Sequence, residues 1–370
     1  MHVINLNDGG GAERFAMGLA LNLPSDRFEL FICSPRPLPD EVVGTLRAGG
    51  VQVMSLGRSG RYDAYRMAGL ARLVRKHRID ILHAHLFGSN LWSSLVGRLC
   101  RVPVVLAHEH TWSYEGNPLR CAIDGYVIGR LATRFIAVSE ADAERMRRIE
   151  HVPAHKVTLM PTAYVPHRPQ PAVDLRAELG LTADAPLIAS VAIMRPQKAL
   201  DVLVEAHRIV LRSLPDAHLV FVGGGECRDA IETLVVDLGL EANVHFLGHR
   251  TDVDGILKTV DVCVLASDFE GTPLIAFEAM ANLTPFVATA VGGLPDIIDD
   301  GRTGLLVPPR RPDLLASALI RVLSDPGAAT AMAAAAAESL APYQIDAVAR
   351  RFAEFYERLA AEVDRGPRST

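Results

Sequence analysis

The sequence predicts an α/β protein with two doubly wound, Rossmann-like halves. Short apolar runs typical of buried parallel strands alternate with longer amphipathic runs typical of helices along almost the whole chain. A proline-rich stretch, 160–174, interrupts this alternation once, as a joint between two domains would. The length of 370 residues also suits two domains of ordinary size better than a single core.

The expected elements follow one another in a regular order. In the first half we expect strands at 2–6, 28–34, 80–85, 102–110 and 135–139, and helices at 11–23, 39–50, 89–100 and 140–149. After the joint we expect strands at 186–192, 217–225, 242–248, 260–267, 285–289 and 304–309. The alanine-rich segment 328–337 is a helix by propensity, and apolar residues at three- and four-residue steps predict a last amphipathic helix over 344–364.

Composition and charge narrow the classes of function. The chain is 49% hydrophobic and 22% charged, as in packed globular proteins, and its net charge of −5 argues against general nucleic-acid binding. Its five cysteines lack the spacing of a zinc site or a disulfide framework, which favours reduced thiols. There is no signal-peptide pattern and no apolar run of the roughly 18 residues that a membrane span needs. We therefore expect a cytoplasmic protein.

Two glycine-rich loops raise the question of a dinucleotide cofactor. Both NDGGGAER and VGGGECRD follow an expected strand and open a helix, but Arg14 and Arg228 stand where the G-x-G-x-x-G fingerprint requires its last glycine. An oxidoreductase is therefore the least favoured class. The loops either let backbone amides approach a phosphate or are simply tight turns.

The segment DFEGTPLIAFEAMA carries two carboxylates near one expected ligand edge. Glu270 follows the expected strand, Thr272 and Pro273 suit the N-cap and first position of a helix, and Glu278 lies within that helix. Carboxylates accept hydrogen bonds from sugar hydroxyls, and helix N-terminal amides bind phosphate. The alternative is that one glutamate caps the helix and the other lies on the surface.

Two cations follow the first expected strand of the second half. Arg195 and Lys198 can neutralise a leaving diphosphate there, although a solvated loop pair is the plainer interpretation. Together with the two glutamates, they predict a site for a ligand with both sugar and diphosphate groups.

Short motifs along the whole chain carry a resemblance to a known family. They are GGAER (10–14), DILHAHLFGSN (80–90), EHTW (109–112), AVSEA (137–141), RPQKALDVLVEA (195–206), FVGGGE (221–226), VHFLGHRTDV (244–253), EGTPLIAFEAMA (270–281), GGLPDII (292–298) and GRTGLLVPP (301–309). In this order and spacing, the chain resembles the family 4 glycosyltransferases of the GT-B fold.

The resemblance implies a domain plan and a type of reaction. It implies an acceptor-binding Rossmann-like domain over 1–165, a nucleotide-sugar-binding domain over 166–343, a central cleft between them, and a C-terminal helix, 344–370, that returns to the first domain. It also implies transfer with retention of anomeric configuration and no obligate metal or other cofactor. A UDP- or GDP-sugar is the expected donor substrate.

The resemblance also implies roles for individual residues. Arg195 and Lys198 would bind the diphosphate, Glu270 the hydroxyls of the donor sugar, and Glu278 the ribose. Other positions would complete the site: backbone near Gly271, Thr272 and Leu274 and the Gly10–Gly11 turn around phosphate and sugar, His249 and Arg250 near the base, and His85 and His110 on the acceptor side. His110, Arg195, Lys198 and Glu270 are the catalytic candidates.

The chain departs from the family pattern at a few positions. Ile193 stands where many relatives have arginine, so that Arg195 lies three positions before the lysine instead of five. Ala199 replaces a usual glycine, and the first strand is about three residues short, which is consistent with a trimmed or misassigned start. None of these changes removes a charge that the chemistry needs.

Three further signals have a plain and a specific interpretation. His83, His85, His108 and His110 can meet at neighbouring strand ends, but no carboxylate or cysteine accompanies them, so we expect no metal. Asp252 of the DVD segment is better explained as a helix cap than as a metal ligand. The basic segment 58–78 is either a solvated helix face or a contact with anionic lipid at the inner face of the membrane.

The predicted function is retaining transfer of a hexose-type sugar from a nucleotide diphosphate sugar to a hydroxyl acceptor. The acceptor would be a glycan, a glycolipid or a lipid-linked saccharide, as in polysaccharide biosynthesis. A GT-B sugar-nucleotide epimerase and a catalytically silent relative that only binds nucleotide sugar remain as alternatives.

Overall fold

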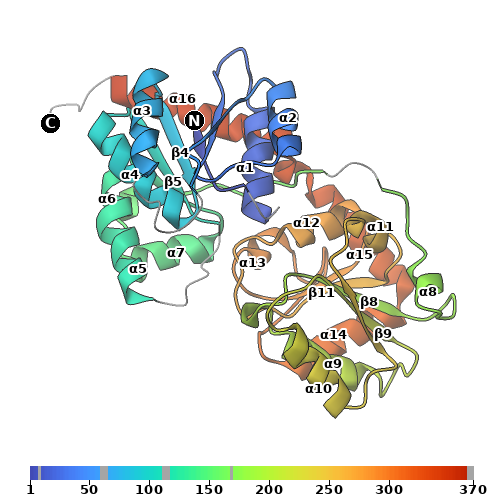
Figure 1. The fold of residues 1–370 in the computed structure, drawn as a ribbon. Helices are drawn as coiled ribbons and strands as arrows, with labels where there is room; N and C mark the ends of the chain where they lie inside the picture. The colour runs from blue at the N-terminus through green and yellow to red at the C-terminus, as the bar shows by residue number, and fades with distance from the viewer. Residues whose placement is uncertain (7–9, 59–65, 111–116, 167–169, 365–370) are drawn as a thin grey trace. The chain divides into compact units, whose positions relative to one another are not determined.

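The computed structural model describes residues 1–6, 10–58, 66–110, 117–166 and 170–364. The chain divides into two compact units (Figure 1), Met1–Val165 with Pro342–Thr370, and Pro166–Ala341. Each unit contains one parallel sheet with helices packed against it. The predicted class, two doubly wound α/β halves, is confirmed.

The first unit is built on a seven-stranded sheet in the order β3-β2-β1-β4-β5-β6-β7. Because β1 pairs with both β2 and β4, the strand order reverses between β1 and β4, which is where doubly wound sheets bind ligands. The strands are β1 (His2–Val3), β2 (Phe31–Ser34), β3 (Gln52–Ser55), β4 (Ile81–His85), β5 (Val104–His108), β6 (Arg134–Ala137) and β7 (Val157–Leu159).

Helices cover both faces of this sheet. Successive residues of a strand point to opposite faces, and Val3 and Ile4 accordingly belong to two different core clusters. The helices are α1 (Gly11–Asn22), α2 (Asp40–Ala48), α3 (Ala68–Lys76), α4 (Phe87–Cys100), α5 (Pro118–Ile123), the π-helix η2 (Asp124–Ile128), α6 (Gly129–Leu131), α7 (Glu140–Arg148), the 3-10 helix η3 (Ala154–Lys156) and α16 (Ile345–Asp364).

The last helix, α16, belongs to the first unit and packs beside α1 (Figure 1). The rings of Phe15 and Phe352 lie 5.9 Å apart. Just before α16 begins, the backbone N–H of Tyr164 donates to the carbonyl of Tyr343 at 2.7 Å. The apolar positions expected from the sequence, among them Val348 and Leu359, are the buried ones.

The second unit has a six-stranded sheet in the order β10-β9-β8-β11-β12-β13, which reverses between β8 and β11. The strands are β8 (Leu187–Val191), β9 (His218–Val222), β10 (Val244–Gly248), β11 (Val262–Leu265), β12 (Phe286–Thr289) and β13 (Leu305–Val307). The helices are α8 (Leu175–Glu178), the 3-10 helix η4 (Pro196–Lys198), α9 (Leu200–Val210), α10 (Arg228–Asp237), α11 (Val253–Leu257), α12 (Leu274–Ala281), α13 (Leu294–Ile297), α14 (Pro312–Ser324) and α15 (Pro326–Ser339), followed by the 3-10 turn η5 (Ala341–Tyr343).

The structure differs from the expected elements mainly at the sheet edges. Strands β3 and β7 were not expected; they are the outermost strands of their sheet, and the partly exposed β3 lacks a continuous apolar run. Strand β1 is shorter than the expected 2–6. Among the described residues, no helix is both long and apolar enough to cross a bilayer.

Candidate active site

The second sheet brings Lys198 and Glu270 together at its reversal point. Lys198 ends η4, which follows β8, and Glu270 lies in the loop that follows β11, the neighbouring strand. Nζ of Lys198 lies 2.5 Å from Oε1 of Glu270. The Lys198 side chain is 15% exposed and that of Glu270 6%, so this is a largely buried ion pair.

A third group fixes the glutamate. The hydroxyl of Ser267 donates to Oε1 of Glu270 at 2.6 Å, so both hydrogen bonds found among the described residues fall on the same oxygen. Oε2 is thereby left to accept from a ligand hydroxyl. A buried carboxylate fixed by a cation and a hydroxyl is a pre-oriented hydrogen-bond acceptor.

Close backbone contacts hold the neighbouring loops in place. Gly292 has a φ of +57°, and a Cβ on it would lie 2.0 Å from the carbonyl oxygen of Glu270. Beside it, the N–H of Gly293 donates to the carbonyl of Gly271 at 2.6 Å. The turn after β12 therefore packs directly against the loop that carries Glu270.

The GGG loop after β9 has the same kind of role. A Cβ on Gly225 would lie 2.4 Å from the carbonyl oxygen of Met194, and the N–H of Met194 donates to Gly224 at 2.9 Å. Of the two interpretations left open by the sequence, this contact favours glycines required by close backbone packing. They support the segment that leads to Lys198.

The helix after Glu270 begins one residue later than expected. Pro273 is extended, with a ψ of 126°, and takes the N-cap position, so α12 starts at Leu274 and Thr272 is not its N-cap. Pro273 has no side-chain acceptor with which to cap this end. Of the first three amides, that of Ala276 donates to the carbonyl of Pro273 at 3.1 Å, whereas those of Leu274 and Ile275 can donate to a ligand.

The remaining predicted donor residues lie in four places in the second unit. Glu278 is buried within α12, and Arg195 is exposed at the N-terminal end of η4. Gly271 adjoins Glu270 in the loop. His249 is exposed, directly after β10.

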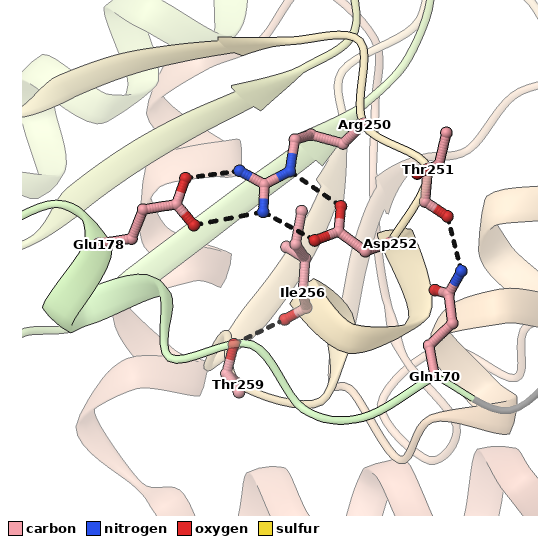
Figure 2. A network of polar contacts seen from close by, with 7 residues as sticks. All are labelled: Gln170, Glu178, Arg250, Thr251, Asp252, Ile256 and Thr259. Atoms are coloured by element: carbon pink, nitrogen blue, oxygen red, sulfur yellow. Dashed lines mark hydrogen bonds and ion pairs between the residues drawn. The ribbon is translucent and has the colours of Figure 1, made fainter.

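Arg250 is engaged by two carboxylates (Figure 2). Its guanidinium donates to Glu178 at 2.5 Å and to Asp252 at 2.7 Å, and these bonds raise its pKa further above the usual range. Asp252 does occupy the N-cap position of α11, but it makes no capping bond, because its carboxylate binds Arg250. The backbone of Arg250 is available to a nucleotide base. Its guanidinium could contact a base only if these ion pairs were broken.

The reversal point of the first sheet carries glycines and imidazoles. Gly10 is the N-cap of α1 and Gly11 its first residue. His85 ends β4 and is fully buried, so it has no surface for direct contact with an acceptor. His110 follows β5 and is half-buried.

Five imidazoles form two hydrogen-bonded rows under α1 and α16. In one row, Nε2 of His110 lies 3.0 Å from Nδ1 of His85, and Nε2 of His85 lies 3.1 Å from Nδ1 of His2. In the other, Nε2 of His83 lies 3.1 Å from Nδ1 of His108, and Nδ1 of His83 lies 2.6 Å from the Tyr356 hydroxyl.

Burial keeps all five rings neutral. It lowers the pKa of His2 and of His110 to about 3, and the pKa values of the other three lie well below the usual value. Neutral imidazoles are also good ligands for transition metals. Within the described residues, two groups, His2/His83/His85 and His85/His108/His110, each place ring nitrogens within 4.8 Å of one another.

A second charged cluster, next to His110, was not predicted from the sequence. Arg120 of α5 lies 3.3 Å from the carboxylate of Glu109 and 3.5 Å from that of Asp124, and its guanidinium lies over the Phe87 ring. Burial raises the pKa of Asp124 to about 6 and that of Glu150 to about 7. Arg120 and Asp124 stand at i,i+4 spacing, but only folding brings Glu109 and Phe87 to this pair, so local spacing could not have identified the cluster.

Comparison with known proteins identifies the class to which this fold and site belong. Residues 173–339 match the model of the glycosyl transferases group 1, and residues 9–168 match that of the glycosyltransferase family 4. The chain belongs to the family 4 glycosyltransferases. The predicted resemblance is thereby confirmed.

Relatives and solved structures agree with this assignment. The chain is 33% identical to a D-inositol 3-phosphate glycosyltransferase of Mycobacteroides abscessus, over 96% of this chain and 86% of the relative. It is 27% identical to the UDP-Gal:alpha-D-GlcNAc-diphosphoundecaprenol alpha-1,3-galactosyltransferase of Escherichia coli, over 85% of each. Among solved structures, Anabaena HepE with UDP-glucose has a TM-score of 0.82 at 19% identity, covering 96% of this chain and 98% of that one. The structure of sucrose-phosphate synthase from Thermosynechococcus elongatus has a TM-score of 0.79 at 23% identity, covering 98% of each. The GT-B fold is confirmed.

Proposed function

We propose that this glycosyltransferase moves a sugar, with retention of configuration, from a nucleotide diphosphate sugar to a hydroxyl acceptor. The observation that carries the proposal is the buried Lys198–Glu270 pair at the reversal point of the second sheet, beside the uncapped start of α12. A cation and free helix amides suit a diphosphate, and a fixed carboxylate suits a sugar hydroxyl. The UDP-Gal and UDP-glucose in the names of similar proteins favour a UDP-sugar over a GDP-sugar.

Each unit has its own part in this proposal. The second unit, 166–341, binds the donor, and the first unit, 1–165 with 342–370, binds the acceptor. The E. coli relative acts on a diphosphoundecaprenol-linked sugar, which supports a lipid-linked saccharide as one acceptor class, alongside a glycan or a glycolipid.

In the reaction, the residues bind and orient the reactants and stabilise charge. Lys198, Arg195 and the first amides of α12 receive the charge that develops on the departing diphosphate. Glu270 orients the donor sugar through Oε2. The acceptor hydroxyl attacks on the face from which the diphosphate leaves, and the leaving phosphate takes its proton, so the step needs neither a covalent enzyme intermediate nor a metal.

The other predicted residues complete the site. Glu278 binds the ribose, and the backbone at His249 and Arg250 meets the base. The turn at Gly10–Gly11 and the backbone of Gly271 and Thr272 close around phosphate and sugar. His110 orients the acceptor hydroxyl.

Turnover of a panel of UDP- and GDP-sugars tests the proposal. Lys198→Ala and Glu270→Ala should each lower transfer or donor hydrolysis about 10²- to 10³-fold. Lys258→Ala, which removes an exposed lysine bonded to the Gln170 carbonyl, is the matched control and should leave turnover unchanged. Near-normal activity of either site variant would contradict the role of that residue. If the protein converts the donor to its epimer in the absence of acceptor, the sugar-nucleotide epimerase is favoured. If it binds the donor but does not turn it over, the catalytically silent relative is favoured.

We also propose peripheral contact with an anionic membrane through the basic segment 58–78. Of this segment, 59–65 lies outside the described residues. In α3, Arg72, Arg75 and Lys76 are exposed and no acidic residue is present. The double variant Arg75→Glu with Lys76→Glu should sediment less with phosphatidylglycerol vesicles than the wild type. The control is Arg212→Glu with Arg321→Glu, at two exposed positions of the second unit, and should sediment like the wild type. Equal binding by both double variants would contradict this contact.

A further inference from the structure

His110 is the one member of the imidazole cluster that is not fully buried. His2, His83, His85 and His108 all lie within the core, whereas His110 is half-buried at the carboxyl end of β5. At the carboxyl ends of the strands, an effect of the cluster on a ligand therefore passes through His110. Its ring is held on one edge by His85 and lies 5.3 Å from the Phe15 ring in an edge-on contact.

The row His2–His85–His110 restricts where the protons can be. A neutral imidazole has one N–H donor and one lone pair, and each contact in this row joins an Nδ1 to an Nε2. If Nδ1 of His85 donates to His110, then His110 carries its proton on Nδ1, and His85 must accept from Nδ1 of His2. If the bonds run the other way, all three rings carry the proton on Nε2. The three rings consequently share one tautomer.

We propose that His85 is a positioning residue, which fixes both the ring orientation and the tautomer of His110. The inference rests on the proposed function in one respect, namely that His110 meets the acceptor. Because Nε2 of His110 is engaged by His85, Nδ1 is the atom left to meet an acceptor hydroxyl. Its role as donor or acceptor changes only if the protons of the whole row shift together. A histidine free in solution exchanges between the two tautomers and would present the wrong one part of the time.

A hydrogen-bonded row explains these contacts better than a metal does. In the row, ring nitrogens are already paired with one another at 3.0 and 3.1 Å, and a bound ion would have to replace those bonds. His108 offers a buried Nε2 with no hydrogen-bond partner among the described residues, so metal binding is an outcome that the experiment must be able to detect.

The first measurement needs no substrate. In full-length protein with ¹⁵N-labelled histidine, the ring nitrogens of His85 and His110 should report the same single tautomer. In His85→Leu, His110 should show a mixture of tautomers. His83→Leu is the matched control: it removes an equally buried imidazole, bonded to Tyr356 and His108 instead of His110, and should leave the His110 signals unchanged. Different tautomers at His85 and His110 in the wild type would overturn the proposal, and this arm stands even if the Leu variants fail to fold.

The second measurement is turnover of UDP-glucose. His85→Leu should lower kcat about tenfold with little change in the KM for UDP-glucose, because orientation is lost while donor binding is retained. His85→Asn can place an amide near the position of Nδ1 and should recover activity to within about threefold of the wild type. Unchanged kcat in His85→Leu would overturn the positioning role. If the wild type does not turn over UDP-glucose, the ¹⁵N spectra alone decide the inference, and only the proposed function is affected.

A metal analysis completes the test. Purified protein should contain no stoichiometric transition metal, and EDTA should leave the His110 signals unchanged. A bound equivalent of zinc, nickel or copper whose removal changes those signals would overturn the hydrogen-bonded row in favour of a metal centre.

Discussion

In the first unit, β4 at the reversal point and its neighbour β5 end in imidazoles that burial keeps neutral. In the second unit, the loops that follow the two strands at the reversal point bring a lysine and a glutamate into an ion pair. Both edges are built on parallel strands in a doubly wound order. The difference teaches that the fold supplies a place for a ligand, while the residues at the strand ends determine the charge of that edge of the sheet. A neutral edge suits an uncharged hydroxyl acceptor, and a charged edge suits a diphosphate.

The largest effects are expected where a glycine lets backbones approach closely in each unit. A Cβ on Gly125 would lie 1.7 Å from the carbonyl oxygen of Glu150, and one on Gly292 2.0 Å from that of Glu270. Gly125→Ala should destabilise the first unit by more than about 3 kcal/mol. Gly292→Ala should abolish turnover by displacing the Glu270 loop.

Gly44→Ala is the control for both substitutions, because a Cβ at this helical position meets nothing within 4 Å. Urea unfolding and donor turnover measure the two effects. Wild-type stability in Gly125→Ala would contradict the close contact between Gly125 and the Glu150 carbonyl. Wild-type turnover in Gly292→Ala would contradict the contact between Gly292 and the Glu270 carbonyl.

The neutral edge should make the first unit sensitive to acid. The five imidazoles have lowered pKa values, so the stability that they contribute is present above their ordinary pKa of 6.5 and is lost as the pH falls. Three buried carboxyls with raised pKa values, those of Glu109, Asp124 and Glu150, act in the opposite sense but are outnumbered.

We expect the unfolding free energy of the first unit to fall by about 1–3 kcal/mol per pH unit between pH 6.5 and 4.5. Both tryptophans, Trp92 and Trp112, belong to this unit, so urea unfolding followed by tryptophan fluorescence reports on it selectively. A flat profile over this range would contradict neutral, buried imidazoles.

Glu150→Gln separates the carboxyl contribution from that of the imidazoles. The pKa of Glu150 is raised to about 7 from 4.5, so wild-type Glu150 contributes stability below pH 4.5 that is lost as the pH rises through 7. Relative to the wild type, Glu150→Gln should therefore gain about 3 kcal/mol between pH 4.5 and pH 8. The same fluorescence-detected unfolding measures it. Glu140→Gln, at an exposed position of α7, is the matched control, and an equal gain there would refute the assignment to Glu150.

The smallest effect is expected at Arg250. Its carboxylate partners are partly exposed, with Glu178 at 43% and Asp252 at 35%, so Arg250→Ala should cost at most about 1 kcal/mol. If the base meets the backbone at this position, the affinity for UDP, measured by calorimetry, should change less than about threefold, since no side-chain contact to the ligand is lost. A tenfold loss of UDP affinity would instead indicate that the guanidinium leaves its pairs to bind the nucleotide.

The sequence predicted those parts of the structure that depend on local pattern. Lys198 and Glu270 could be placed at one edge of the second sheet because each follows an apolar strand. His85 and His110 could be placed at one edge of the first sheet because each ends an expected strand. The start of α12 was misplaced by one residue, because Pro273 fits both an N-cap and a first helical position and only its ψ decides. The sequence indicated that four imidazoles can meet at neighbouring strand ends, but not the hydrogen bonds that arrange them in two rows. The contacts of Arg120 with Glu109 and Phe87 likewise arise only in the folded chain.

Hydrogen exchange of the full-length protein, with and without UDP, tests most directly whether the charged edge of the second unit receives the diphosphate. The account predicts that UDP slows exchange of the amides in 194–199 and 268–276, with Lys258→Ala behaving like the wild type and Lys198→Ala losing most of the protection. Protection by UDP confined to other segments, with these amides unchanged, would contradict it.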